Sequence, residues 1–185
     1  MRRVLEVVVT VVIAAVAGTS GAAAQSVRYG IGGGLIAPSG DYSNLDQAGW
    51  HALGKVDLRI PMSPVGVRVD GMYGRTSHQN GVEGNTKLAG GTADLVVNIP
   101  LAVPMVKPYL LAGVGVANVK TSIPSLSVDT SATKVAFGGG AGVSIGVGPV
   151  HGFVEARYLT VPSSYLSGNA TGFLPITAGL TFGSK

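Results

Sequence analysis

The stretch HALGKVDLRIPMSPVGVRVDGMY, residues 51–73, alternates apolar and polar side chains in two runs, separated by a turn that contains two prolines. In residues 51–60 and again in residues 65–73, apolar side chains or glycines alternate mostly with Lys, Arg, Asp or other polar residues. A period of two residues is typical of β-strands whose two faces differ in chemistry. The stretch therefore predicts an antiparallel hairpin with one apolar face and one charged face.

The same alternation recurs along the chain and predicts eight strands. They cover residues 27–37, 51–60, 65–74, 89–99, 107–119, 135–145, 150–158 and 172–182. The connections alternate between short turns and long loops, and the long loops are residues 38–50, 75–86, 120–133 and 159–171. Long loops on one rim of the sheet, the loop rim, and short turns on the other, the turn rim, are typical of an up-and-down transmembrane barrel.

Residues 1–24 have the form of a secretory signal peptide. Two arginines precede an apolar run, 7–17, and the small residues 22–24 form a cleavage site. The run is short for a transmembrane helix, the alternative interpretation, which needs roughly 20 residues. We therefore expect an exported chain in which residues 25–185 form one barrel domain.

The composition argues against several classes of protein. Charged residues make up 12% of the chain, whereas an ordinary soluble domain is about 25% charged. The formal net charge of +4 at pH 7 is small and scattered, which argues against a nucleic-acid partner. The chain contains no cysteine, so neither a lipid-acylation site nor a disulfide framework is expected.

The charged residues indicate which face of the sheet meets lipid. Assigned by parity, the apolar face carries charge only at the loop rim, on Arg75 and Lys87. The opposite face holds nine charged residues of both signs: Arg28, Lys55, Asp57, Arg59, Arg68, Asp70, Asp94, Glu155 and Arg157. A soluble barrel would direct such charges outward, whereas a lipid-facing apolar wall around a charge-paired lumen accounts for both faces. The prediction is an all-β fold, an eight-stranded antiparallel up-and-down transmembrane β-barrel, whose closure leaves no unpaired edge.

Three further patterns support expectations about facing. Glycines in 27–37 and 135–145 are predicted to leave room in the lumen for long Arg and Lys side chains. In 107–119 both parities are apolar or glycine, and we interpret the outward set as Leu110, Ala112, Val114 and Val116. Aromatic residues near strand ends or on the outward parity predict interfacial belts, with a soluble core as the alternative: Tyr29, Trp50, Tyr73, Tyr158 and Phe182.

The chain resembles the small outer-membrane β-barrel family of the OmpA/OmpX type. The resemblance rests on the leader, on the segments KPYLLAGVG (107–115) and FVEARY (153–158), and on the ending PITAGLTF (175–182). It implies residence in the outer membrane, in contact with its lipid and lipopolysaccharide. It also implies a terminal signal for the barrel assembly machinery at Gly179, Leu180 and Phe182. The chain departs from the family pattern in having Gly183–Lys185 beyond the last aromatic and Leu180 where an aromatic residue is often found.

We interpret the charged lumen as the filling of a narrow barrel, because eight strands leave room for little more than side chains and buried charges need partners. The predicted role is structural or surface-interacting, through the long loops of a monomeric barrel, and their ligand is open. A narrow pore for small solutes or ions is the first alternative. A soluble periplasmic barrel that binds lipid or another ligand is the second.

An enzyme is not expected, because a nucleophile, a base and an orienting acid do not assemble in the predicted barrel. His78 lies in a predicted loop, and His51 and His151 begin strands at opposite rims. The nearest approach to a catalytic group is His151 with Ser144 and Glu155, for which a solvated rim is the alternative interpretation.

No cofactor or metal is expected either, because no histidine has ligand spacing from another histidine or from an acidic pair. Four acidic residues in the predicted loops would be available to a divalent cation that bridges lipopolysaccharide, although solvated loops are the favoured interpretation. They are Asp41, Asp46, Glu83 and Asp129.

Overall fold

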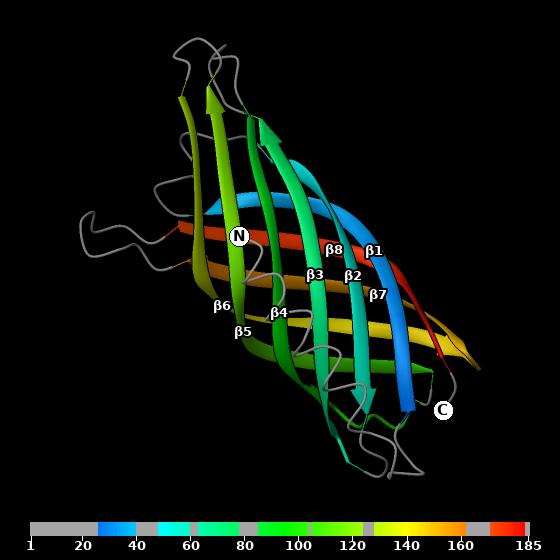
Figure 1. The fold of residues 1–185 in the computed structure, drawn as a ribbon. Helices are drawn as coiled ribbons and strands as arrows, with labels where there is room; N and C mark the ends of the chain where they lie inside the picture. The colour runs from blue at the N-terminus through cyan, green and yellow to red at the C-terminus, as the bar shows by residue number, and fades with distance from the viewer. Residues whose placement is uncertain are drawn as a thin grey trace.

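The computed structural model describes residues 26–39, 48–59, 63–77, 85–103, 105–123, 128–161 and 171–183. Their strands are β1 (Ser26–Ser39), β2 (Gly49–Arg59), β3 (Val65–Ser77), β4 (Asn85–Asn98), β5 (Val106–Ile123), β6 (Val128–Val147), β7 (Val150–Val161) and β8 (Thr171–Phe182). Each strand pairs antiparallel with the next, and β1 pairs with β8, which closes the barrel (Figure 1). The predicted fold class is confirmed. In the described ranges no helix is long and apolar enough to span a membrane.

Several strands run further toward the loop rim than the sequence pattern predicts. The largest difference is at residues 120–133, where the predicted loop is wrong because β5 and β6 stay paired as far as Ile123 and Val128. The Ser- and Thr-rich composition of this stretch resembles that of a loop. Hydrogen bonding along the ladder nevertheless extends both strands, and threonine is well suited to a strand.

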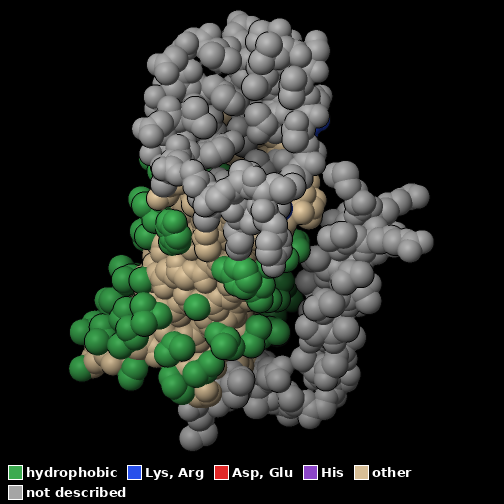
Figure 2. All heavy atoms as spheres, turned by 90° about the vertical axis from the view of Figure 1, so that its left-hand side faces the viewer, with side chains coloured by type: hydrophobic (Ala, Val, Ile, Leu, Met, Phe, Trp, Pro, Cys, Tyr) green, Lys and Arg blue, Asp and Glu red, His purple; other side chains and the backbone are tan. Residues whose placement is uncertain are grey.

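The outer wall is apolar. Large exposed hydrophobic side chains occur on every strand, among them Ile31, Leu95, Val154 and Ile176. Figure 2 shows hydrophobic side chains over the lower part of the described barrel in that view, with no charged side chain among them. On β5 the outward facing of Leu110, Ala112 and Val114 is confirmed, because all three are exposed. Val116 has the same parity and is half-buried.

The predicted aromatic residues all lie exposed on the outer wall, with between 41% and 59% of their surface accessible. Tyr29 pairs with Phe182 near the turn rim. Trp50 and Tyr73 lie nearer the loop rim, with their ring centroids 6.0 Å apart. The alternative interpretation of these residues as a soluble core is therefore wrong.

The barrel interior has two zones. The charged residues occupy its middle and its turn-rim half. In the loop-rim half lies an apolar layer, which the sequence pattern does not predict, formed by Ile36, Leu88, Ala117, Ala136, Leu159, Val161 and Phe173. Parity places these side chains inward, but Leu88, Leu159 and Val161 belong to strand ends outside the predicted strands, so the prediction omitted them.

Candidate functional site

The candidate site is the lumen charge network. Strand register brings its members together, because alternate residues point inward and neighbouring strands place inward residues side by side. Asp57 lies opposite Arg68, which in turn lies opposite Asp94 on β4. Lys55 lies opposite Asp70. Eight of the nine predicted residues are buried, and Arg59 is half-buried.

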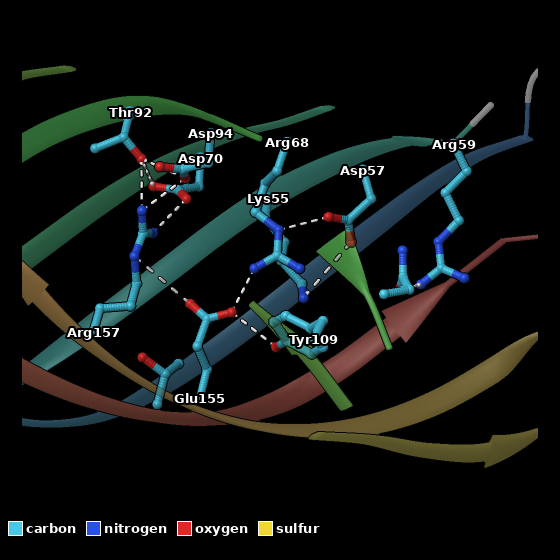
Figure 3. Close-up of polar contacts among 12 residues, drawn as sticks. Lys55, Asp57, Arg59, Arg68, Asp70, Thr92, Asp94, Tyr109, Glu155 and Arg157 are labelled. Atoms are coloured by element: carbon cyan, nitrogen blue, oxygen red, sulfur yellow. Dashed lines mark hydrogen bonds and ion pairs between the residues drawn. The ribbon is translucent and has the colours of Figure 1, made fainter. Parts of the chain in front are cut away.

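Arg68 joins three strands. Its Nε donates to Asp57 Oδ1 at 2.5 Å, and its Nη1 donates to Glu155 Oε2 across the lumen. The Tyr109 hydroxyl donates to the same Glu155 oxygen at 2.8 Å, and the Arg68 guanidinium lies 5.1 Å from the centroid of the Tyr109 ring. Glu155 thus connects β7 with both β3 and β5 (Figure 3).

Arg157 forms a second centre in the network (Figure 3). Its Nη1 donates to Asp70 Oδ2 at 2.6 Å, and its Nη2 donates to Asp94 Oδ2 at 2.7 Å. The Thr92 hydroxyl lies within hydrogen-bond distance of both carboxylates, at 3.0 and 2.9 Å, and accepts from Arg157 at 3.0 Å. Arg157 on β7 is thereby tied to β3 and β4 on the other side of the lumen.

Glycines make room for the long side chains, as predicted. A Cβ atom on Gly30 would lie 2.7 Å from Cε of Lys55, and one on Gly140 would lie 2.9 Å from Cγ of Arg157. The Lys55 ammonium lies 3.6 Å from the centroid of the Phe153 ring, a cation–π contact, and 3.7 Å from Asp57 Oδ2.

Two of the predicted residues lie apart from this network. Arg28 Nη1 is 3.5 Å from Nδ1 of His151, and both residues are buried. Arg59 Nη2 donates to the side chain of Asn98 at 3.5 Å. The structure therefore divides the predicted set into a central group of seven residues and these two arginines nearer the turn rim.

The weak catalytic candidates have other partners. Glu155 is held by Arg68 and Tyr109, and Ser144 lies opposite Phe153 in register rather than opposite His151. His151, Ser144 and Glu155 are buried, so their interpretation as a solvated rim is wrong. His51 is also buried, and its Nε2 lies 2.8 Å from the Thr177 hydroxyl.

Tyr109 and Thr92 are members of the network that the sequence prediction missed. That prediction counted charged side chains on the polar face, and these two residues carry none. Strand parity nevertheless places both side chains in the lumen. Thr92 has the inward parity of Asp94, and Tyr109 has the parity opposite to that of the outward Leu110. Counting hydrogen-bonding groups by parity would have found both.

Within the described ranges, no three His, Cys, Asp or Glu side chains are grouped as around a metal ion. Of the acidic residues considered for a cation, Asp41, Asp46 and Glu83 lie outside the described residues. Asp129 lies in β6, opposite Ser122.

The three residues predicted as an assembly signal lie in β8. Leu180 and Phe182 are exposed on the outer wall. A Cβ atom on Gly179 would lie 2.8 Å from the inward-facing ring of Phe153. Their recognition by an assembly machinery stays a prediction.

The two lumen zones meet around a small cavity. Between the Arg157 centre and the apolar layer lies a cavity of about 30 Å³, lined by Asp70, Arg157, Leu88, Leu159 and Phe173 among others. A cavity of this size has room for about one or two water molecules. The arrangement therefore cross-links strands on opposite sides of the barrel and leaves little free space between its two zones.

Comparison with known proteins identifies the barrel. The family model for the outer membrane protein beta-barrel domain matches residues 9–182, and no curated protein sequence matches the chain. Among solved structures, Neisserial surface protein A is 20% identical, with a TM-score of 0.61, over 85% of this chain and 96% of that one.

Two further solved structures have the same fold. The attachment invasion locus protein Ail of Yersinia pestis, in complex with the heparin analogue sucrose octasulfate, is 22% identical with a TM-score of 0.51, over 85% of this chain and 97% of that one. The N-terminal β-barrel domain of Pseudomonas aeruginosa OprF is 14% identical with a TM-score of 0.50, over 85% and 96% of the two chains. The family resides in the outer membrane, so the alternative of a soluble periplasmic barrel is wrong. The chain belongs to the outer membrane protein beta-barrel domain family.

Proposed function

We propose that this outer-membrane barrel is a non-conducting scaffold that acts through the loops at its loop rim. The observation that supports the proposal is the filling of the lumen, in which Arg68 and Arg157 reach carboxylates across the barrel beneath an apolar layer. The charged residues serve as a structural filling in this proposal, and none has a catalytic role.

Two different barriers oppose ion flow. An ion entering the network would have to displace buried ion pairs, and separating such pairs leaves uncompensated charge in a poorly solvated interior. An ion entering from the loop rim would first have to cross the layer around Phe173, and apolar constrictions exclude water and ions by dewetting. Because the barriers lie in series, opening only one of them would leave the lumen closed.

Planar-bilayer recording of the refolded protein tests this part of the proposal. The wild type, Arg157→Ala and Phe173→Ala are each expected to show no channel steps, whereas the double variant Arg157→Ala/Phe173→Ala is expected to conduct. Wild-type steps would support the narrow-pore alternative instead. Current that appears in Arg157→Ala or Arg68→Ala alone would identify the charge network as a gate.

The loop rim is the part of the scaffold available for surface contacts, because binding residues are concentrated on loops carried by a rigid frame. The names of two proteins with this fold, a surface protein and an attachment protein, favour a surface role. At their low sequence identity this likeness shows the fold alone, so the role and its ligand belong to our proposal. The proposal also includes a monomeric state and recognition of Gly179, Leu180 and Phe182 by the barrel assembly machinery.

Cells that display the protein provide the test of the loops. A variant in which residues 41–46 and 164–169 are replaced by Gly-Ser linkers is compared with the wild type for adhesion to a heparin-coated surface and to cell monolayers. We expect the variant to keep the heat-dependent gel mobility of a folded barrel and to lose adhesion. Equal adhesion by the two proteins would contradict a role for these loops.

A further inference from the structure

The turn between β4 and β5, residues 99–105, is apolar throughout. β4 ends and β5 begins at the turn rim (Figure 1), and the sequence across this turn, IPLAVPMV (99–106), contains no polar or charged side chain. In the part that the structure describes, 99–103 and 105, the large side chains are between 40% and 54% exposed: Ile99, Leu101, Val103 and Met105. The turn therefore presents an apolar surface beyond the ends of its two strands.

Backbone hydrogen bonds fix the position of this turn. The N–H of Ile99 donates to the carbonyl of Pro108 at 2.9 Å, which continues the pairing of β4 with β5. The N–H of Gly146 on β6 donates to the carbonyl of Met105 at 3.2 Å. The turn is thus attached to two neighbouring strands, and its apolar side chains project from a defined backbone.

The backbone is also suited to contact with lipid. Polar backbone groups that meet lipid without a partner are costly. The N–H of Val106 donates to the carbonyl of Val103 at 3.3 Å. Pro100 and Pro104 have no backbone N–H at all. The turn therefore has fewer unpaired donors to desolvate than a loop of other residues would have.

The apolar surface of the turn continues the lipid-facing wall. On the outward face of β4, Ala93, Leu95 and Val97 are exposed, and Ile99 follows them with the same parity. No charged residue interrupts this face between Ala93 and Ile99, because the charged residue in that range, Asp94, is buried in the lumen. The wall and the turn form one continuous apolar surface.

The turn lies at the level of the headgroups of the inner leaflet. Lys87, the charged residue at the loop-side end of the outward face of β4, precedes Val97 by ten residues (97 − 87 = 10). Ten residues span about 34 Å along a strand, which corresponds to roughly 26 Å along the membrane normal at a tilt of about 40°. The apolar band of such barrels is about 25 Å tall. With Lys87 at one edge of the band, Val97 lies at the other edge, and the turn follows it on the periplasmic side.

A groove of about 480 Å³ lies beside the turn. Pro64, next to the first residue of β3, lies in its wall together with Leu101 and Val103 of the turn. The polar residues in the wall are Ser63, Asn98 and Lys107. A largely apolar groove with a few polar residues suits the boundary between acyl chains and headgroups.

We propose that residues 99–105 are an interfacial anchor, whose side chains insert among the phospholipid acyl chains of the inner leaflet. Apolar segments at a membrane interface bury their side chains about 5–10 Å into the boundary between headgroups and acyl chains. Continuity with the lipid-facing wall and the level of the turn favour lipid over a second copy of the chain as the partner. The anchor holds the β4–β5 side of the turn rim at the membrane surface, and it is separate from the lumen network and from the loop contacts proposed above.

Tryptophan fluorescence measures the depth of the turn. Trp50 is the single tryptophan of the chain, so Trp50→Phe/Leu101→Trp places one indole in the turn. Residues 25–185 of this reporter protein are refolded into phosphatidylcholine vesicles whose acyl chains are brominated at their middle, at their end or not at all. We expect an indole about 5–10 Å below the headgroups, quenched strongly by mid-chain bromine and weakly by acrylamide in the water.

Matched variants test whether the apolar side chains cause the insertion. Adding Val103→Asp to the reporter protein is expected to weaken quenching by bromine and to strengthen quenching by acrylamide. Adding Pro149→Asp instead places the same charge in the exposed turn between β6 and β7 and is expected to change neither. Heat-dependent gel mobility establishes that each protein is folded.

The outcomes are distinct. Quenching of the reporter mainly by acrylamide, or quenching that Val103→Asp leaves unchanged, would overturn the proposal. Because the chain has no cysteine, Val103→Cys tests the second copy: a disulfide-linked dimer in vesicles together with weak quenching by bromine would assign the turn to a contact between copies instead. Failure of the loops to support adhesion would leave the measured depth unchanged, so the two proposals are tested separately.

Discussion

Glu155 is the residue on which the lumen network depends most. It accepts hydrogen bonds from Arg68 and Tyr109, and its other oxygen lies 3.8 Å from Nε of Arg157. Its side chain is 1% exposed, so water cannot readily replace the carboxylate as a hydrogen-bond acceptor. Removing this carboxylate would leave two buried guanidinium groups short of an anion.

We therefore expect Glu155→Ala to reduce the free energy of unfolding by about 3–5 kcal/mol. Tyr109→Phe removes one hydrogen bond to the same oxygen and keeps the charge, so a loss of only about 1 kcal/mol is expected. Urea unfolding of the barrel in lipid vesicles measures both values. A loss below that of Tyr109→Phe would show that Glu155 is not a centre of the network.

Gly140 shows how the backbone accommodates the network. An added Cβ atom would lie 2.9 Å from the Cα and the Cγ of Arg157, one of them a backbone atom that cannot easily move. Gly54, in contrast, is exposed on the outer wall, and an added Cβ atom there would meet nothing within 4 Å.

Gly140→Ala is therefore expected to destabilise the barrel by about 1–3 kcal/mol through overpacking. Gly54→Ala serves as the matched control, with a change expected within about 0.5 kcal/mol, as for other surface substitutions. The same urea titration compares them. Equal stability of the two variants would mean that the lumen has room that the structure does not show.

At the scale of the element, each strand combines an apolar outer face with a polar or tightly packed inner face. Val154 lies near the middle of β7 and is 58% exposed, whereas Leu35 lies toward the loop rim of β1 and is 65% exposed. Similar exposure at different depths separates the effect of the membrane from the effect of exposure itself.

An arginine at the bilayer midplane of a barrel costs about 2–4 kcal/mol, whereas one near the interface costs about 0–1 kcal/mol. We expect Val154→Arg to fall in the first range and Leu35→Arg in the second, measured by unfolding from lipid vesicles. Both variants should behave alike in detergent if depth is the cause. Equal losses in vesicles would contradict a bilayer midplane near Val154 and an interface near Leu35.

At the scale of the whole molecule, closure depends on strands at the two ends of the chain. Tyr29 of β1 and Val150 of β7 both lie opposite Phe182. The pairing itself is made by the backbone and does not require the aromatic ring. A role of that ring in recognition during assembly can therefore be separated from a role in stability.

We expect Phe182→Ala to refold into lipid vesicles in vitro with nearly wild-type yield, while its amount in the outer membrane of expressing cells falls severalfold. Heat-dependent gel mobility of the two preparations measures both quantities. Thr181→Ser, at an inward position next to it, is the control and should leave both unchanged. A wild-type level of Phe182→Ala in cells would remove Phe182 from the proposed assembly signal.

The sequence by itself determined the strand count, the closed barrel and the facing of most side chains. The reason is physical: side chains on a strand alternate between two faces, so the parity of Lys55, Arg68 or Val67 already decides whether each meets the lumen or lipid. A shift of register by one residue would expose the charged side chains to lipid. Only one register therefore keeps them in the lumen.

Only the tertiary structure decided which residues meet. Parity assigns a face but not a partner across the lumen, and Arg68 and Glu155 are 87 residues apart in the chain. The same holds for the apolar layer around Phe173 and for the contacts of Arg157 with Asp70 and Asp94. These contacts depend on strand register and on strand ends, which are set by hydrogen bonding between neighbouring strands and by the closure of the barrel.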